Sequence, residues 1–534
     1  MTNFLAYNGI TGMSADVTFT VLFALITALV MLPAIWLLTK FIKKPKYAVT
    51  YAEQSAAFAA GEQKVAPVKF SFGGILAAII GVGLIVRLLF SFFITGYRVE
   101  FSGLFGIFGS DPTSYFTKSS DAIIHYPLII YLFSFFGLFA QGFGIGADAF
   151  AAPVLVKLPM ILADMGLIYL CYHAAKKYIN EYTALVLAGF VAVFPPLVFA
   201  SSVWGSVYSI LAVFLALTFY FMVSKNYAGM FVAYAFALLT AKDALYLFPV
   251  VAIFVIYQFI KTLRYISTNN IKGFKAVMAD KNARSAVLLP TYVLAAWLGM
   301  WLLSLPLVYN YSASPFRFTY MLYFYPLAPD LSTVTQYYGF NALNVYNLFF
   351  NNGVALGSGF PGVFFAIAFA VLISLLVGVV YLSRKNRANL VYLAAYILLT
   401  LSIFYVDFGA MNLIAVLPLL LIALVFIRDR RILTLTVVLG LAVVLNGSFV
   451  MMHAGYISSA PEADFIAGYT LESVRLFKET GWLAANYVMS IIVILAEIYA
   501  TIIILDIAMS NKRKLFADLP KSTFGKSLLK FLKD

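Results

Sequence analysis

Long runs of apolar residues, separated by short polar segments, make up most of this chain. Most runs approach the roughly 20 residues that an α-helix needs to cross a bilayer. Charged residues fall mainly between the runs, as they do in the loops of membrane proteins. The runs predict about 13 transmembrane helices, at 17–39, 71–95, 152–173, 182–200, 207–223, 227–241, 243–260, 287–306, 361–383, 388–406, 411–427, 432–451 and 484–509. The pattern therefore predicts an all-α, polytopic membrane protein.

The stretch 126–146 is apolar enough to be a further span, but the charges argue against it. If it stays outside the bilayer or is half-inserted, every strong basic cluster lies on one side, in agreement with the excess of Lys and Arg in cytoplasmic loops. These clusters are Lys40, Lys43, Lys44 and Lys46; Lys176 and Lys177; Lys261 to Arg284; Arg384, Lys385 and Arg387; Arg428, Arg430 and Arg431; and the tail from Lys512. We therefore predict a multi-pass cell-membrane protein with an external N-terminus, a cytoplasmic C-terminus and a long first external loop.

The composition supports a membrane location and indicates which partners the positive charge favours. The chain is 63% hydrophobic and 11% charged, against about 25% charged in a typical soluble domain. Its formal net charge of +14 is carried by short clusters between apolar runs. This distribution favours contact with anionic lipid headgroups and argues against nucleic acid as a partner. The single cysteine, Cys171, excludes an intrachain disulfide, and residues 1–16 show no signal-peptide pattern.

The spans and loops divide the chain into four parts. Two long external loops, 96–151 and 307–360, indicate that the protein works at its outer face. The parts are an extra N-terminal span with a basic cytoplasmic loop (1–70), the main transmembrane region (71–451), an external loop with the last span (452–509) and a basic amphipathic cytoplasmic tail (510–534).

Ionisable residues within spans require a partner or a function, because burying charge in a bilayer is expensive. Arg87 and Lys157 are two such cations, Lys242 is expected at the outer tip of a short helical hairpin, and too few buried acids are present to pair with all three. They point to a shared anionic ligand, for which a lipid-linked phosphate at the outer face is suited. For the acids Asp164 and Glu497, internal ion pairing is an equally good interpretation. Lys157 and Asp164 lie two helical turns apart on one face.

The first long loop carries Glu100, Asp111 and Asp121, each of which could simply be solvated. No metal site is expected, because the three histidines are widely separated and no zinc-binding motif is present. The sequence also has no phosphate-binding glycine loop and no serine-hydrolase elbow. Nucleotide hydrolysis and serine-hydrolase chemistry are therefore not indicated.

Three consecutive stretches resemble the middle of the bacterial GT-C glycosyltransferases, which are multispanning enzymes that use polyprenyl-phosphate sugars. The stretches are KLPMILADMGLIYLCYHAAKK, AVFPPLVFASSVWGSVYSILAVFLAL and AGMFVAYAFALLTAKDALYLFPV. The likeness extends backward to the spacing between Glu100 and Tyr126 and forward to YYGFNALNVYNLFF. It covers roughly 71–451 and implies a GT-C-like helical bundle.

Four positions depart from the family pattern. Glu100 stands where the family usually has Asp, and WGSVYS replaces Trp-Gly-Gln-Val-Asp-Ser. Ala241-Lys242-Asp243 replaces Lys-Pro-Gln, and Gly409-Ala410-Met411-Asn412 falls at the family's His-Glu-Arg-Tyr. Together these departures indicate either a distant subfamily with another substrate or a scaffold that has lost catalysis.

The resemblance implies an inverting transfer of sugar from a polyprenyl-phosphate donor to a cell-surface glycan or a lipid-linked acceptor. Glu100 is the expected general base, with Asp111 as the second catalytic acid, and Arg87, Lys157 and Lys242 bind the donor phosphate. No divalent metal or other cofactor is required. The expected substrate pocket contains Tyr126, Trp204, Tyr208, Asp243, Asn341 and Asn347.

Two alternatives remain beside the enzyme. One is a catalytically inactive GT-C-like protein that binds lipid-linked sugar or assists a partner protein of glycan assembly. The other is a lipid-linked glycan transporter, for which symmetric halves with broken helices are expected. The chain shows no convincing internal repeat, which lowers the weight of the transporter.

Overall fold

The structure, a computed structural model, describes most of the helical region of the chain. The described residues are 72–94, 104–107, 126–146, 149–280, 282–308, 314–319, 343–348, 387–404, 409–457 and 482–508. Within these ranges the regular structure is entirely helical and contains no strand. The predicted all-α class is therefore confirmed for this part of the protein.

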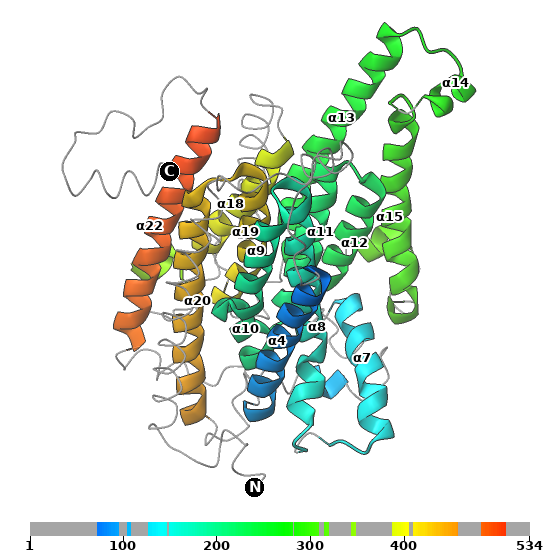
Figure 1. Cartoon of the computed structure of the whole chain (residues 1–534). Helices are drawn as coiled ribbons and strands as arrows, with labels where there is room; N and C mark the ends of the chain where they lie inside the picture. The colour runs from blue at the N-terminus through cyan, green and yellow to red at the C-terminus, as the bar shows by residue number, and fades with distance from the viewer. Residues whose placement is uncertain are drawn as a thin grey trace, which may run out of the picture.

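Figure 1 shows the described helices, which fall into three groups along the chain. The first group is α4 (Phe72–Phe93), α7 (Pro127–Gly142), α8 (Ala152–Tyr178), α9 (Glu181–Val193), α10 (Pro195–Val198), η1 (Phe199–Trp204), α11 (Tyr208–Ser224) and α12 (Tyr227–Thr240). The second group is η2 (Lys242–Leu247), α13 (Phe248–Thr268), α14 (Phe274–Ala279), α15 (Ser285–Val308), α16 (Pro315–Thr319) and η4 (Val345–Leu348). The last group is α18 (Arg387–Phe404), η5 (Ala410–Ala415), α19 (Val416–Ile427), α20 (Arg430–Ile457) and α22 (Trp482–Ala508).

Among the described residues, seven helical stretches are long and apolar enough to cross a membrane, so the chain is a transmembrane protein. They are Gly73–Phe93, Ala152–Tyr178, Lys242–Thr268, Ser285–Leu307, Ala410–Ile427, Arg430–Ser448 and Asn486–Leu505. The bent pair formed by α9 with α10 and η1 would make an eighth. The predicted number of about 13 is not confirmed. The apolar stretches Pro127–Gly142, Tyr208–Ser224, Tyr227–Thr240 and Ala388–Phe404 are shorter than these spans. The predicted spans 17–39 and 361–383 lie outside the described residues.

The predicted span 182–200 is broken rather than continuous. Asn180 begins α9 by accepting a hydrogen bond from the backbone N–H of Thr183 (2.8 Å), as helix-capping residues do. The adjacent Pro195 and Pro196 then end it, because proline cannot supply the backbone N–H that a helix interior needs. The chain turns by 44° and continues as one π-helical turn up to Trp204. A π-turn inside a helical region often marks a functional site.

Glycines allow the helices around this break to approach closely. A Cβ added to Gly83 of α4 would lie 3.1 Å from Ile168 and 3.2 Å from Ala192. On α20, a Cβ at Gly440 would lie 2.6 Å from Pro196, and one at Gly447 would collide with Phe199. Small residues at helix contacts are the usual means of tight packing in membranes. The π-turn is therefore held between α8 and α20.

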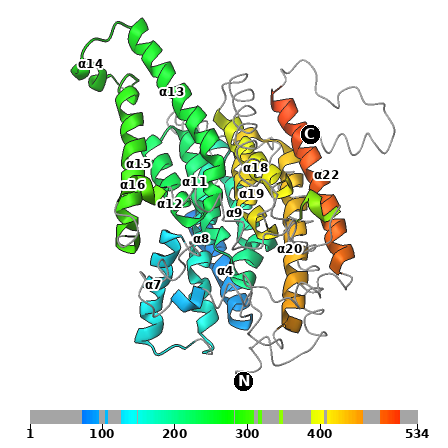
Figure 2. The ribbon, with the colours of Figure 1, turned by 180° about the vertical axis from the view of Figure 1, so that it is seen from behind.

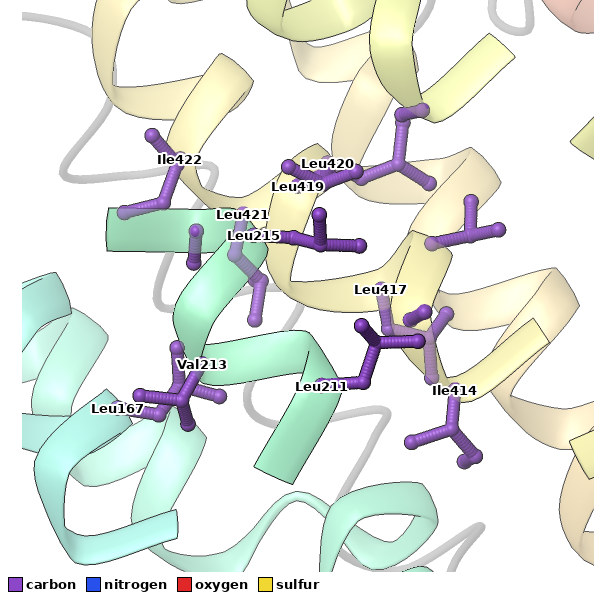
Figure 3. Close-up of a cluster of buried hydrophobic side chains, with 14 of the residues drawn as sticks. Leu167, Leu211, Val213, Leu215, Ile414, Leu417, Leu419, Leu420, Leu421 and Ile422 are labelled. Carbon is purple, nitrogen blue, oxygen red and sulfur yellow. The ribbon is translucent and has the colours of Figure 1, made fainter. Parts of the chain in front are cut away.

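The centre of the bundle is apolar and lies where α8, α11 and α19 meet. Figure 3 shows leucine, valine and isoleucine side chains from these helices and from η5 directed toward one another. Leu211, Leu215 and Leu417 are fully buried there. This apolar packing supports the neighbouring helix breaks, where the polar residues gather.

Different helices lie at the two ends of the bundle. Figures 1 and 2 both show α13, α14 and α15 extending beyond one end, while α7 lies near the other. The end of α8 and the α19–α20 turn also meet, since the Arg428 side chain donates to the carbonyl of Tyr178. The end of α4 and the start of α8 likewise meet, through a 2.5 Å hydrogen bond from Lys157 Nζ to the Ile94 carbonyl. The two ends of the segment 95–151 therefore lie at the same end of the bundle. The external location of this segment remains a prediction.

Candidate functional site

Three polar side chains from distant segments meet at one amide. The Nδ2 group of Asn412, in η5, donates to Oη of Tyr208 and to Oδ2 of Asp243, each at 2.8 Å. The Oδ1 atom of Asn412 accepts from the backbone N–H of Gly409 at 3.0 Å. An amide has two hydrogens to donate, so both are used, and the orientation of Asn412 is determined. We call Tyr208, Asp243 and Asn412 the amide cluster.

Each member of the amide cluster stands at an interruption between helices. Tyr208 begins α11, after Gly205 has turned the chain at a φ of 85°. Asp243 lies in η2, which follows the extended residue Ala241, and Asn412 lies in η5, whose preceding residue Gly409 is also extended. Interrupted helices inside a membrane bundle are tolerated where they are buried in protein or line a polar cavity. Their meeting point is therefore the first candidate for a binding site.

Burial within the amide cluster is uneven. Asp243 is 2% exposed and Asn412 is 8% exposed, whereas Tyr208 is only partly buried. The neighbouring Ser206 is fully buried, and its hydroxyl accepts from the backbone N–H of Tyr208 at 3.4 Å. Tyr208 is therefore the most exposed member of the amide cluster.

Lys157 lies near the π-turn, and its contacts there are with backbone carbonyls of the protein itself. Its ammonium donates to the carbonyl of Ile94 at 2.5 Å and to that of Ser202 at 2.8 Å. Its stem packs along Gly205, where an added Cβ would lie 3.5 Å from the lysine Cγ. The side chain is 1% exposed. It therefore connects the end of α4 to the π-turn, and two of its three hydrogens are already donated.

Arg87 is likewise committed to protein partners. Its Nε donates to Oδ2 of Asp164 at 2.8 Å, and Nη1 donates to the carbonyls of Gly83 and Ala192 at 3.1 and 2.6 Å. Arg87 is fully buried and Asp164 nearly so. Asp164 thus forms the internal ion pair that the sequence left open, and its partner is Arg87. Two helical turns span about 11 Å, which keeps Lys157 out of reach of Asp164 along α8.

The remaining predicted site residues are placed as follows. Lys242 is the first residue of η2, is partly buried and precedes Asp243. Trp204 is the last residue of the π-turn, is buried and lies beside Phe199, with ring centroids 6.2 Å apart. Tyr126 precedes α7 as its capping residue. Glu100, Asp111 and Asn341 lie outside the described residues, as does the side chain of Asn347.

The sequence predicts Tyr208 and Asp243 as pocket residues, but it does not predict Asn412, which joins them. Asn412 was noted only as part of a segment from which the family's ionisable residues are missing. Its amide was the available signal, because an amide can bridge a phenol and a carboxylate. In the part of the chain that the structure describes, no group of three or more His, Cys, Asp or Glu could hold a metal ion.

Comparison with known proteins gives no further identification. No protein-family model matches the chain, and no curated protein sequence matches it.

Proposed function

We propose that this protein is a membrane glycosyltransferase that moves a sugar from a polyprenyl-phosphate donor to a cell-surface glycan or lipid-linked acceptor at the outer face. The amide cluster carries the proposal. Its members are separated by 204 and 169 residues along the chain. They come from three segments at which the sequence resembles, and departs from, the polar motifs of GT-C enzymes. Their meeting supports the view that these segments form one site.

In this proposal Asn412 is a positioning residue. Its two hydrogen bonds hold the Asp243 carboxylate and the Tyr208 phenol in one arrangement. A carboxylate and a phenol can bind sugar hydroxyls, since the first accepts hydrogen bonds and the second both donates and accepts. Asp243 and Tyr208 would therefore orient a sugar, with Lys242 beside them as the cation for the donor phosphate.

The proposed reaction is a single displacement at the anomeric carbon. A carboxylate takes the proton from an acceptor hydroxyl as its oxygen forms a bond to that carbon. The bond between the anomeric carbon and the phosphate oxygen breaks, and polyprenyl phosphate leaves with the electron pair. Glu100 is the base we propose. A cation stabilises the negative charge that develops on the leaving phosphate.

We propose a smaller set of phosphate ligands than the sequence suggests. Arg87 is held by Asp164 and two carbonyls, and Lys157 is held by two carbonyls. Both buried charges are thereby accounted for by protein partners. Lys242 is the member of the original three that adjoins the amide cluster in sequence, and we keep it as the phosphate ligand.

The same observation favours a second candidate function. A catalytically inactive GT-C-like protein would bind lipid-linked sugar, or assist a partner enzyme, without stabilising a leaving phosphate. The commitment of Arg87 and Lys157 to structural contacts fits such a scaffold. The two functions share the amide cluster and differ in whether sugar is transferred.

Transfer of sugar by the full-length protein in lipid nanodiscs tests the proposal. Defined polyprenyl-phosphate sugars are supplied with extracted surface glycan, and product formation is measured. Asn412→Ala is expected to reduce kcat about 100-fold, the effect of displacing reacting groups by about 1 Å. Glu100→Gln is expected to reduce the rate about 100- to 10,000-fold as general-base catalysis is lost, while Glu100→Asp keeps part of the activity.

A matched pair of tyrosines supplies the control. Tyr208→Phe removes the hydroxyl that Asn412 contacts, and Tyr131→Phe removes one that donates to the Leu303 carbonyl between α7 and α15. We expect reduced transfer only in the first. Binding of lipid-linked sugar without transfer by the unmodified protein would establish the scaffold instead. Undiminished transfer in both Glu100→Gln and Tyr208→Phe would refute the site.

A further inference from the structure

A second buried acid, Glu497, has surroundings quite unlike those of Asp164. It lies in the middle of the membrane-spanning stretch Asn486–Leu505 of α22 and is 6% exposed. Its Oε1 atom lies 2.6 Å from Oγ1 of Thr400 on α18, whereas its Oε2 atom has no hydrogen-bond partner. Among the described residues it forms no ion pair. An ionised carboxylate left in this position would be strongly unfavourable.

The single hydrogen of the Thr400 hydroxyl lies near two acceptor oxygens, so both contacts are full hydrogen bonds only if Glu497 donates one of them. Thr400 Oγ1 also lies 2.8 Å from the backbone carbonyl of Tyr396. A carbonyl can only accept, and a threonine hydroxyl has one hydrogen to donate. If Thr400 donates to that carbonyl, the hydrogen in the 2.6 Å contact must come from Glu497. The separation is that of a strong O–H···O hydrogen bond.

The neighbouring hydroxyls are committed in the same way. Thr501 Oγ1 lies 2.8 Å from the backbone carbonyl of Glu497 and donates to it. Its 3.1 Å contact with Oη of Tyr396 is then made by the tyrosine hydrogen. The Tyr396 hydroxyl is also within hydrogen-bonding range of the Glu497 carboxyl, so its one hydrogen is shared between that carboxyl and Thr501. The described hydroxyls therefore supply a carboxylate with little beyond this shared hydrogen, whereas the Thr400 oxygen can accept a hydrogen bond from a neutral acid.

No charged group near Glu497 favours its ionised form over its neutral form. The titratable groups from α18 that interact electrostatically with Glu497 are Tyr392 and Tyr396. Tyr392 is also within electrostatic range of Asp429 and Arg431, but these two residues pair with each other at 2.7 Å in the α19–α20 turn. The structure describes no Lys, Arg or His in contact with Glu497.

We infer that Glu497 is a proton-binding site inside the membrane, with the neutral acid donating a hydrogen bond to Thr400 and so joining α22 to α18. The ligand of this site is a proton. The inference is independent of sugar transfer, since it rests on contacts in another part of the bundle.

Infrared difference spectroscopy on the full-length protein in nanodiscs tests the inference. The C=O stretching band of a protonated carboxyl group is expected at neutral pH and should be absent from Glu497→Gln. Asp429→Asn, which changes a charged acid in a turn, should leave the band unchanged. Thr400→Val removes the acceptor, so the band should shift to the frequency of an acid that donates no hydrogen bond. Thr400→Val therefore tests the inference even if Glu497→Gln does not fold.

Two results would overturn the inference. One is the absence of a protonated-acid band, or the failure of both the Glu497→Gln and the Thr400→Val substitutions to change it. The other is loss of the band on addition of sodium chloride at constant pH. This result would mean that the Glu497 carboxylate binds a sodium ion in place of the proton. A band that is insensitive to sodium and altered by either substitution supports proton binding.

Discussion

Asp164 and Glu497 are both acids buried in membrane-spanning helices, yet their partners are opposite in kind. Asp164 faces a fully buried guanidinium at 2.8 Å, while Glu497 faces the hydroxyl of Thr400, which is also within hydrogen-bonding distance of a backbone carbonyl. In the first region a counter-ion offsets the cost of burying charge, and in the second the proton removes the charge itself. The comparison teaches that the function of a membrane-buried acid depends on its partners more than on its depth.

The largest effect is expected from breaking the ion pair on the Asp164 side. Arg87→Met leaves a buried carboxylate without its cation, and Asp164→Asn leaves the guanidinium without its carboxylate. Removing one partner of a buried pair costs about 3–5 kcal/mol. We expect a loss of this size in the free energy of unfolding of each single variant, measured in bicelles.

The double variant Arg87→Met with Asp164→Leu is the control for this prediction. Because both charges are removed together, it should recover most of the lost stability. A double variant as unstable as the two single losses added together would show that the residues do not act as a pair.

A smaller effect is expected from Lys157→Met. The methionine keeps the apolar stem beside Gly205 but leaves the carbonyls of Ile94 and Ser202 without the ammonium donor. A buried group that loses its hydrogen bond costs about 1–3 kcal/mol, part of which is regained because no ammonium is buried. We expect a net loss of about 2 kcal/mol. Increased hydrogen exchange confined to 199–206 would locate it at the π-turn, and unchanged exchange there would contradict the role of Lys157 as a brace.

Glu497→Gln is expected to change the free energy of unfolding very little. The side-chain amide of glutamine can donate to Thr400 as the neutral acid does, so the contact between α18 and α22 survives. We expect unfolding to change by about 1 kcal/mol or less, against the much larger loss for Asp164→Asn. Thermal unfolding of the two variants side by side provides the measurement. Equal losses would mean that Glu497 is ionised in the folded protein.

Most helices of the described region could be predicted from the apolar pattern alone. The predicted span 388–406 corresponds to α18 and 484–509 to α22, because a bilayer requires long, uninterrupted apolar stretches. The break at Pro195 was not predicted, since the apolar run continues through it. The adjacent prolines were its sequence signal, because two prolines in succession interrupt helical hydrogen bonding.

The partners of polar residues were much harder to predict. Arg87 and Asp164 are separated by 77 residues, and which acid meets which cation depends on how α4 packs against α8. Asn412 carries no charge, so the search for ionisable groups within spans passed over it. The partners of Glu497 are hydroxyl groups, whose hydrogen bonds leave no distinctive sequence pattern. Helices are local in sequence, whereas sites in a bundle are assembled from distant segments.

The smallest effect is expected from replacing Asp280, an acid that lies outside the membrane-spanning helices. Asp280 precedes α15, and its Oδ1 atom accepts hydrogen bonds from the backbone N–H groups of Ala283 and Asn282, each at 2.8 Å. These bonds, that from Ala283 first, and the Tyr265 hydroxyl hold the pKa of Asp280 below its usual value. Here water and backbone dipoles stabilise the carboxylate, so neither a cation nor a proton is needed.

The sign of the pH dependence follows from this lowered pKa. The folded state binds the proton of Asp280 more weakly than the unfolded state, so the carboxylate contributes stability above the unfolded pKa of about 4. That contribution is lost as the pH falls through the folded value. Asp280→Ala should therefore loosen the turn before α15 at neutral pH and have no effect in strong acid. Amide hydrogen exchange at Ala283 measures this directly, with Tyr265→Phe as the milder companion variant, because it removes only the 3.3 Å contact. Protection of Ala283 that is the same in Asp280→Ala and the unmodified protein at neutral pH would show that the carboxylate does not hold the turn.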